Sequence, residues 1–362
     1  MKNNHIPIYS TSIGEQEKKY VNECLDTNWI SSKGKFVNLF ELYFSQFINS
    51  NSTSVSNGTV ALDLALRVLN IGINDEVIVP TFTYVASVNA IRYVGANPIF
   101  VDSDIDTWNI DTNKIVKKIT KKTKAIMAVH IYGNPCNMKK LQNICSEHNL
   151  LLIEDAAEAF GSYYLNKHVG TFGDISTFSF FGNKTITTGE GGMIVSNDLS
   201  KIKKCNFLKS QAVSETIEYW HDEIGYNYRM TNIQAAIGLA QLEKANSILK
   251  KKFIIANLYK EYLKDTDIIF QTTETNSIHS YWMVAILCST PEKLKLLRSH
   301  LLKNDIETRP FFNPVHSMPV FYENTKYEIA NDISARGLNL PSYPDLSHED
   351  IIKICEKIKE VI

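Results

Sequence analysis

One lysine, Lys184, lies in surroundings that are unusual for a lysine. It belongs to the stretch FSFFGNKTITTGEGGM (178–193), in which small, polar and glycine residues follow an apolar run and the next charged residue is Glu190. A partly desolvated lysine is neutral often enough to attack a carbonyl group and form a Schiff base. We therefore expect Lys184 to be reactive and free of a salt bridge, although the tip of an ordinary hairpin is the alternative.

The residues before Lys184 narrow the chemistry further. A nucleotide-binding P-loop has glycine directly before its lysine, but Asn183 occupies that position here, so we do not expect a triphosphate site of that kind. The hydroxyl of Ser179, five residues earlier, could bind a phosphate group across the turn that contains Gly182.

Two earlier stretches also have residue types suited to holding a phosphorylated ligand. In SVSNGTVALDLAL, Gly58 and Thr59 start a helical pattern, and the unpaired amides of a helix start can bind phosphate. A simple N-cap is the alternative. In PTFTYVASVNAI, Tyr84 follows a strand and could stack on a planar ligand, whereas many such aromatic residues belong to the core.

Two carboxylates follow the hydrophobic run LLLIED. Asp155 ends that run and could pair with a cationic heterocycle, or it could cap the next helix. Glu158 lies three residues later, where the acidic partner of a capping box is the plainer interpretation. Together these candidates are the parts that a pyridoxal phosphate (PLP) enzyme needs: a phosphate-binding turn, an aromatic residue, an aspartate at a strand end, and a serine with a lysine.

These residues must be positioned by a sheet, and the chain contains suitable strands. Nearly continuous apolar runs predict strands at 76–80, 97–102, 124–130, 150–155, 175–181 and 191–196. Helical patterns alternate with them, which indicates an α/β fold with a largely parallel sheet covered by helices. Ligands of such sheets gather at the carboxyl ends of the strands, where the candidates lie. A long helical stretch (231–264) then leads into a smaller C-terminal lobe, and we place the boundary near 245.

Composition limits the possible partners and compartments. The 362 residues carry a formal net charge of -1, so no overall basic field predicts binding to nucleic acid or to a membrane surface. The six cysteines are far apart and have no metal-type spacing, which favours a reduced, cytoplasmic protein without a metal site. The N-terminal stretch has no apolar segment of signal-peptide length.

The motifs together resemble those of the sugar-nucleotide aminotransferases, the DegT/DnrJ-type branch of the fold-type I PLP enzymes. The matching blocks include VSNGTVAL, VIVPTFTYVASVNAI, IEDAAEAFGS, GTFGDISTFSFFGNKTITTGEGGM and GYNYRMTNIQAAIGLAQLE, and the resemblance covers nearly the whole chain. It implies a large PLP-binding domain with a mostly parallel sheet between helices (1–245), a smaller C-terminal α/β domain (246–362), and a homodimer or larger assembly with its active site at the subunit interface.

The resemblance also implies roles for single residues. Lys184 and Asp155 are the expected catalytic residues, and many relatives have Gln or His where Glu158 stands. Contacts with PLP are implied for Gly58, Thr59, Tyr84, Asp155, Glu158, Ser179, Lys184 and, from the neighbouring subunit, Asn227. Contacts with the sugar nucleotide are implied for Trp29, Ser32, Arg229, Arg309 and His316.

The expected reaction is a transamination. Relatives that remove a hydroxyl from the sugar have His in place of the lysine, so Lys184 favours amination. The resemblance implies transfer from L-glutamate to carbon 4 of GDP-4-keto-6-deoxy-D-mannose, giving GDP-4-amino-4,6-dideoxy-D-mannose (GDP-perosamine) for surface polysaccharide (O-antigen). A UDP- or dTDP-linked 4-keto-6-deoxy sugar is the alternative acceptor. A cofactor-binding scaffold without turnover and a PLP enzyme of sulfur metabolism are further alternatives.

Overall fold

The main sheet forms where the apolar runs predicted strands. The computed structural model describes residues 5–362, so the first four residues of the predicted large domain lie outside the described part. In spatial order the seven strands are β1 (Asn51–Val55), β9 (Gly192–Ser196), β8 (Ile175–Ser179), β5 (Leu151–Asp155), β4 (Thr123–Val129), β2 (Glu76–Pro80) and β3 (Asn97–Val101). The five strands from β8 to β3 are parallel, while β9 and β1 are antiparallel to their neighbours. The predicted largely parallel α/β sheet is therefore confirmed.

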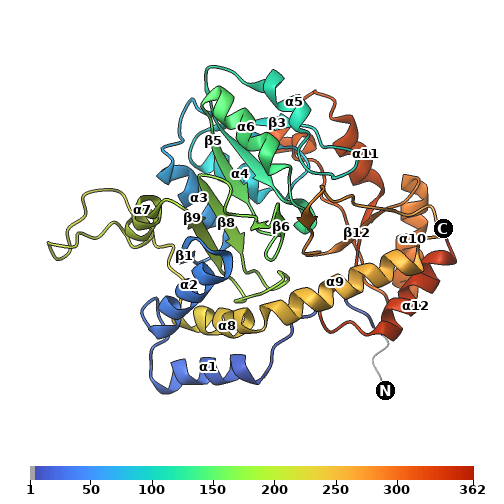
Figure 1. Ribbon diagram of the computed structural model, residues 1–362, viewed down its shortest axis with the longest axis horizontal. Coiled ribbons are helices and arrows are strands. Elements are labelled where there is room, and N and C mark those ends of the chain that lie inside the picture. Colours follow the sequence, from blue (N-terminus) through green and yellow to red (C-terminus); the bar gives the residue numbers. More distant parts are fainter. Residues whose placement is uncertain (1–4) are drawn as a thin grey trace.

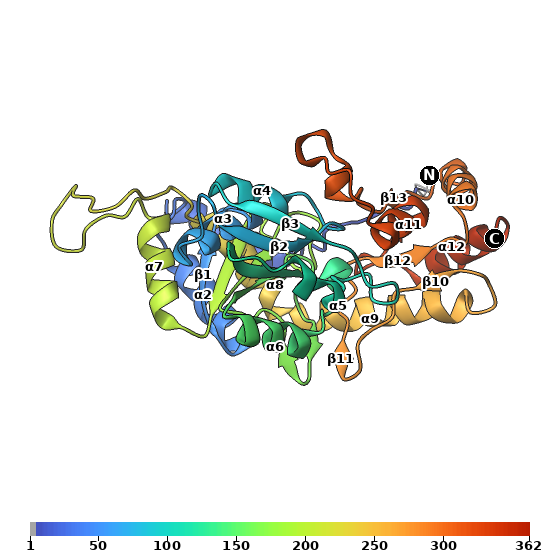
Figure 2. The same cartoon turned by 90° about the horizontal axis from the view of Figure 1, so that it is seen from above.

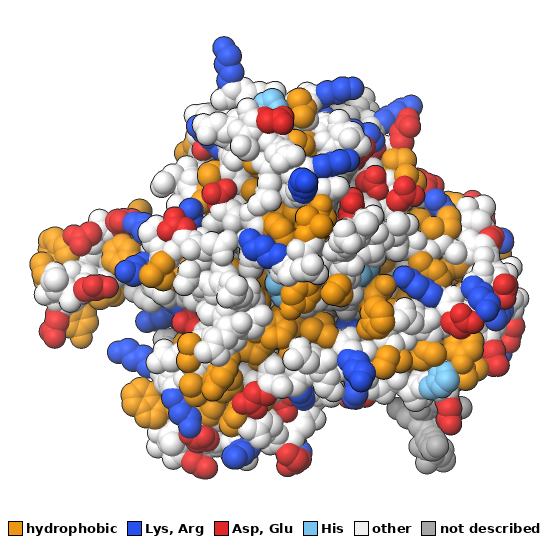
Figure 3. All heavy atoms as spheres, viewed as in Figure 1, with side chains coloured by type: hydrophobic (Ala, Val, Ile, Leu, Met, Phe, Trp, Pro, Cys, Tyr) orange, Lys and Arg blue, Asp and Glu red, His pale blue; other side chains and the backbone are white. Residues whose placement is uncertain are grey.

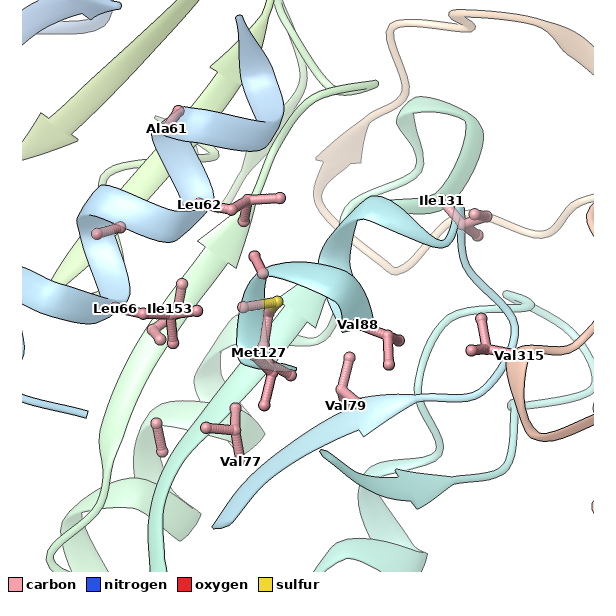
Figure 4. Packing of buried hydrophobic residues seen from close by; sticks show 14 of the residues in the cluster. Ala61, Leu62, Leu66, Val77, Val79, Val88, Met127, Ile131, Ile153 and Val315 are labelled. Atoms are coloured by element: carbon pink, nitrogen blue, oxygen red, sulfur yellow. The ribbon is translucent and has the colours of Figure 1, made fainter. Parts of the chain in front are cut away.

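The sheet is buried on both faces because successive strand residues enter two separate cores. Val77 and Val79 of β2 join one core, and Ile78 between them joins the other. The first core packs under α3 (Gly58–Val68) and α4 (Ala86–Tyr93), as Figure 4 shows for Leu62 and Leu66 against Ile153 and Met127. The second core packs under α2 (Lys35–Ile48), α6 (Met138–His148) and α8 (Asn232–Glu243).

The long helical stretch predicted after residue 231 divides into two helices. α8 ends at Glu243, and α9 (Ala245–Tyr262) runs from it toward the C-terminal part of the molecule (Figures 1 and 2). That part has its own antiparallel sheet in the order β10 (Ile269–Phe270), β12 (Val284–Leu287), β14 (Gly337–Leu340) and β13 (Arg309–Pro310). The helices α10 (Pro291–Lys303), α11 (Glu328–Arg336) and α12 (His348–Lys359) accompany it. The boundary near residue 245 stays a prediction.

The remaining elements are shorter or lie outside these two layers. They are the helices α1 (Glu15–Asp26), α5 (Thr112–Ile115) and α7 (Leu199–Lys209), a small sheet of β11 (Ser277–Ile278), β6 (Tyr163–Tyr164) and β7 (Lys167–His168), and the short 3-10 turns η1 (Val116–Lys118), η2 (Ile131–Gly133), η3 (Val315–Ser317) and η4 (Pro319–Phe321).

Two extended segments lie outside the helices and the three sheets. The first, which we call the strap (residues 6–12), pairs with the C-terminal part through a parallel bridge between Ile6 and Ile306. It then reaches the turn that carries Lys184, residues 181–189, which we call the catalytic turn. There the Thr11 hydroxyl donates to the Gly182 carbonyl at 3.0 Å. The second, which we call the arm (residues 211–226), follows α7 and extends away from the body of the molecule (Figures 1 and 2).

Candidate active site

The turn that carries Lys184 is fixed by backbone hydrogen bonds. After β8 the chain folds back, so that Phe181 and Gly189 form a bridge and Thr188 N donates to the Phe180 carbonyl at 2.9 Å. Gly189 has a φ of +82°, a conformation that favours glycine. The turn therefore holds the Lys184 side chain inward, with 13% of it exposed.

Lys184 has a carboxylate neighbour, contrary to the expectation from the sequence. Its Nζ lies 3.8 Å from Oε1 of Glu158, so the prediction that Lys184 is free of a salt bridge is wrong. The pair forms because the turn after β5 brings Glu158 to the carboxyl edge of the sheet, a proximity that the local sequence around Lys184 does not reveal. Burial lowers the pKa of the Lys184 amine, while Glu158 and Asp155 favour its charged form.

Glu158 is held by the backbone of a strained turn after β4. The Tyr132 N–H donates to Oε2 of Glu158 at 2.7 Å, and Tyr132 has a φ of 58°, which is uncommon for a non-glycine residue. Burial raises the pKa of Glu158 to about 7, although Lys184 and the Tyr132 N–H both favour the carboxylate. The Glu158 carboxyl is therefore suited to taking up and releasing a proton near neutral pH.

The C-terminal part contributes an aromatic wall to the lysine. Lys184 Nζ lies 4.0 Å from the centroid of the Trp282 ring, within the range of a cation–π contact. The indole Nε1 donates to the Asn183 carbonyl at 2.8 Å, which ties Trp282 to the catalytic turn. Its ring also stacks on Tyr132 at a centroid distance of 6.2 Å.

Asp155 ends β5 on the same edge of the sheet. The Ser87 hydroxyl donates to its Oδ2 at 2.7 Å, and the Ala157 N–H donates to its Oδ1 at 3.1 Å. The carboxylate is 5% exposed, so these two donors fix its orientation in a largely dry place. Ser87 belongs to α4, which begins just after Tyr84.

Gly58 and Ser179 are packed against each other. A Cβ on Gly58 would lie 2.9 Å from the Ser179 Cβ, so only glycine allows this approach. Gly58 and Thr59 are the first residues of α3, and Asn57 caps the helix by accepting from Val60 N at 3.0 Å. The sequence-predicted phosphate turn is therefore assembled next to the predicted serine.

Tyr84 is half exposed beside this site, with 59% of the residue accessible. Its ring lies 5.6 Å from the ring of Phe312, a residue of the C-terminal part. Tyr84 is thus not a core residue, which leaves its ring available to a planar ligand.

Three of the predicted substrate residues come together at the start of α8. Asn232 N donates to the Ser31 carbonyl at 2.6 Å, and the Asn232 side chain donates to the Trp29 carbonyl at 2.7 Å. These bonds place the 29–32 segment, with Trp29 and Ser32, against the chain that leads from Arg229 into α8. Trp29 also lines a surface groove with Asn232.

Asn227 lies at the base of the arm. Its side-chain oxygen accepts from the Arg229 guanidinium at 3.0 Å. The carbonyl of the next residue, Tyr228, accepts from Ser56 N of the same chain at 2.8 Å. The chain next to Asn227 therefore lies beside the phosphate turn, although the two are far apart in the sequence. That Asn227 contacts the phosphate site of a neighbouring subunit stays a prediction.

Arg309 and His316 are placed differently from the other predicted substrate residues. The Arg309 guanidinium pairs with Glu307 at 2.6 Å. His316 is 5% exposed, its Nδ1 is 2.7 Å from the Thr81 hydroxyl, and its ring lies 4.5 Å from that of Tyr327. Within residues 5–362 no hydrogen bond joins either side chain to the 29–32 segment. His316 thus fixes the loop that follows Phe312 to Thr81, and the substrate contacts of Arg309 and His316 stay predictions.

Sequence reasoning missed three residues of the site. Ser87, Tyr132 and Trp282 contact Asp155, Glu158 and Lys184, respectively. Tyr132 carried a usable signal, since it follows a buried strand at the edge where ligands gather. Trp282 lies about a hundred residues from its partner in the chain, and nothing local indicates that contact.

The assembled residues fit PLP. Because Gly58 has no side chain, a phosphate can approach the backbone N–H groups at the start of α3. The Ser179 hydroxyl lies next to this helix start. Tyr84 offers a free ring face, and Asp155 offers a fixed carboxylate at the end of β5. Lys184 offers an amine whose contact with Glu158, at 3.8 Å, is longer than a hydrogen bond.

An inward lysine, a strand-end aspartate and a phosphate turn at the carboxyl edge of a mostly parallel sheet define a lysine-dependent PLP enzyme of fold-type I. Comparison with known proteins specifies the family: residues 11–359 match the DegT/DnrJ/EryC1/StrS aminotransferase family, and the chain belongs to it. The predicted enzyme class and family are confirmed.

Two curated relatives of this chain share one activity in their names. A GDP-perosamine synthase of Escherichia coli O157:H7 is 55% identical over 358 residues, which is 98% of each chain. A GDP-perosamine synthase of Vibrio cholerae is 48% identical, again over 98% of each chain. Among solved structures, the putative sugar aminotransferase Spr1654 of Streptococcus pneumoniae in its PLP form superposes with a TM-score of 0.94 at 27% identity, covering 99% of this chain and 98% of the other.

Proposed function

We propose that this chain is a PLP-dependent aminotransferase that makes GDP-perosamine. It transfers the amino group of L-glutamate to carbon 4 of GDP-4-keto-6-deoxy-D-mannose, for use in surface polysaccharide. The observation that carries the proposal is the 55% identity, over 98% of both chains, to a GDP-perosamine synthase. The geometry around Lys184 supports it, because the amine is buried at the carboxyl edge of the sheet with a carboxylate, Glu158, 3.8 Å away.

The residues of the chain divide the chemical work. PLP, when bound, supplies an aldehyde and an electron-accepting ring that stabilises negative charge on the substrate carbon. Asp155, oriented by Ser87, would favour the protonated form of the pyridine nitrogen. Lys184 Nζ moves protons as general base and acid, and Glu158 Oε1 at 3.8 Å can hold the proton that Nζ gives up.

We also propose a homodimer, which the arm supports. Its tip exposes large apolar side chains: Tyr219 is 94% exposed, Ile224 82%, and Ile217 and Trp220 54% each. Figure 3 shows hydrophobic side chains on this arm, well away from the body. Such exposed apolar groups mark an interaction surface, and Asn227 at the base of the arm is the residue expected to reach the partner's phosphate site.

A cytoplasmic location is part of the same proposal. All six cysteines are free and buried, as in proteins of a reducing compartment. None of the helices within residues 5–362 is long and apolar enough to cross a membrane.

The proposal is tested with three acceptors. Purified protein loaded with PLP is given L-glutamate and the GDP-, UDP- or dTDP-linked 4-keto-6-deoxy sugar, and the amino sugar and 2-oxoglutarate are measured. We expect the GDP-linked sugar to give the highest kcat/KM. Preference for the UDP- or dTDP-linked sugar would support the alternative aminotransferase, and no turnover with any of the three acceptors would indicate a scaffold.

The Lys184→Ala variant tests the central residue. We expect product formation to fall by several orders of magnitude, because both the attachment point and the proton carrier are lost. Lys203→Ala on the exposed face of α7 is the matched control. Turnover of the Lys184→Ala protein at a rate near that of the control would contradict the assignment.

A further inference from the structure

Lys252 is a buried amine that the proposed chemistry does not use. It lies on α9 and is 4% exposed. Its Nζ donates to the Trp282 carbonyl at 3.1 Å and to the Ser342 carbonyl at 2.8 Å. Within the described chain no carboxylate acts on this amine, and burial lowers its pKa to about 7. Burying an amine without a counter-ion costs free energy, so packing alone does not account for Lys252.

The two carbonyls belong to the ends of adjacent strands. Trp282 comes just before β12 and Ser342 just after β14, and these strands pair through Val284 and Leu340. The Ser342 hydroxyl also accepts from Val284 N at 3.1 Å. An uncharged amine has two N–H groups, which match two carbonyls, so Lys252 can tie both strand ends to α9 without a charge.

The side chain of one of these residues touches the catalytic lysine. The Trp282 ring lies 4.0 Å from Lys184 Nζ, and its Nε1 donates to the Asn183 carbonyl. Lys252, Trp282 and Lys184 line the same small, tightly packed pocket between the strap and the catalytic turn. The backbone of Trp282 is therefore held from α9 while its indole covers the amine.

We propose that Lys252 is a positioning residue that holds the Trp282 indole against Lys184 and thereby keeps water from that amine. The proposal rests on the aminotransferase function, because it assigns the indole a role at the reacting lysine. Lys252 acts on Lys184 through Trp282 and touches neither substrate nor cofactor. Helix α9 is consequently part of the active site's support as well as a connection between the two parts of the chain.

The proposal has a consequence for protonation. The charged groups that act on Lys184 are Glu158 and Asp155, both from the large sheet, while the C-terminal part presents the uncharged indole. Burial is the largest influence on the Lys184 amine and lowers its pKa. If the indole moves away, water reaches Nζ, and the pKa of Lys184 should rise toward its ordinary value.

The experiment measures that pKa in the full-length, cofactor-free protein. Competitive labelling with acetic anhydride over a pH series, read by mass spectrometry of the peptide that contains Lys184, gives the fraction of neutral amine. We expect Lys252→Met to raise the pKa of Lys184 by about one unit, a tenfold change in the ratio of charged to neutral amine. Lys250→Met, on the exposed face of the same helix, should leave it unchanged.

Two more variants separate positioning from general damage. Trp282→Ala should shift the Lys184 pKa in the same direction, and the double variant should shift it no further than Trp282→Ala alone. Lys252→Gln, whose amide NH₂ keeps two uncharged donors, should lie nearer the wild-type value than Lys252→Met does. In the PLP-loaded enzyme, Lys252→Met should lower kcat about tenfold and change KM little, as expected for a misplaced catalytic group.

Other outcomes would overturn the proposal. An unchanged Lys184 pKa in folded Lys252→Met protein would do so, and so would additive shifts in the double variant. If Lys252→Met does not fold, the comparison is made between Lys252→Gln and Lys252→Leu, and equal pKa values in these two would contradict positioning. Failure of the proposed function would appear differently, as wild-type protein without turnover but with the labelling pattern intact.

Discussion

Lys184 works under two opposing influences that the structure places on one amine. Burial favours its neutral form, which can react, while Glu158 at 3.8 Å favours its charged form. A buried carboxylate next to a buried amine also costs desolvation of both groups. The balance leaves Glu158 with a pKa of about 7, so this carboxyl can accept and release a proton beside Lys184 near neutral pH.

Replacing Glu158 by Gln tests this balance through stability. A folded pKa of about 7, raised from 4.5 by burial, means that the contribution of Glu158 is fully present below about pH 4.5 and is lost as the pH rises through 7. The cofactor-free Glu158→Gln protein lacks this loss, so its free energy of unfolding relative to wild type should improve between pH 5 and pH 8. We expect a gain of roughly 1–3 kcal/mol, measured by urea unfolding at both values. A difference independent of pH would contradict it.

Among the elements, the start of α3 depends most on one small residue. Gly58→Val would place a Cβ only 2.9 Å from the Ser179 Cβ. The phosphate turn must therefore open to make room for the side chain. We expect the dissociation constant for PLP to rise at least about tenfold, measured by titrating cofactor-free protein. Gly72→Ala is the control, because its nearest neighbour would be a carbonyl at 3.7 Å. Unchanged PLP affinity in Gly58→Val protein would mean that the turn does not hold the phosphate.

The arm gives a second prediction at this scale. The double substitution Tyr219→Ser with Trp220→Ser removes two exposed aromatic rings and leaves the backbone bridge between Val213 and His221 in place. We expect the proposed dimer to dissociate at least about tenfold more readily, as measured by sedimentation equilibrium. The control is Leu302→Ser on α10, which is 69% exposed in the C-terminal part. Equal association of both proteins would exclude the arm from the interface.

The sequence was most informative where a residue's role depends on its own strand or turn. Asp155 could be placed because it ends an apolar run, and Gly58 because it starts a helical pattern. Strand β1 was missed because its residues, such as Thr53 and Ser54, are polar and are stabilised in the interior by Glu41. The salt bridge of Lys184 and its contact with Trp282 were beyond prediction, because both depend on how distant segments meet.

At the scale of the whole molecule, Glu154 connects several segments from within the core. Its carboxylate accepts from the N–H groups of Gly170, Phe172 and Gly173, each at 2.7 Å, and lies 3.1 Å from His130 Nε2. Burial raises the pKa of Glu154, but His130 and these N–H groups outweigh burial, and the net pKa is lowered. The stability it contributes is therefore present above about pH 4.5 and is lost as the pH falls through the lower folded value.

Glu154→Gln should destabilise the molecule strongly, because the amide NH₂ would face groups that are themselves donors. We expect a loss of about 3 kcal/mol at pH 7, measured by urea unfolding, and a smaller difference in acid. Glu15→Gln, at a side chain that is 91% exposed, should change the free energy of unfolding little. Equal stability of the Glu154→Gln and Glu15→Gln proteins would show that the carboxylate is dispensable to the core.

The strap sets the order in which the enzyme can be completed during synthesis. Ile6 is translated long before its partner Ile306. Until Ile306 has emerged, the strap has no partner in the C-terminal part, and the wall that it gives to the pocket beside Lys184 is missing. A nascent chain can therefore form the large sheet early, while a finished catalytic turn must wait until Ile306 has been translated.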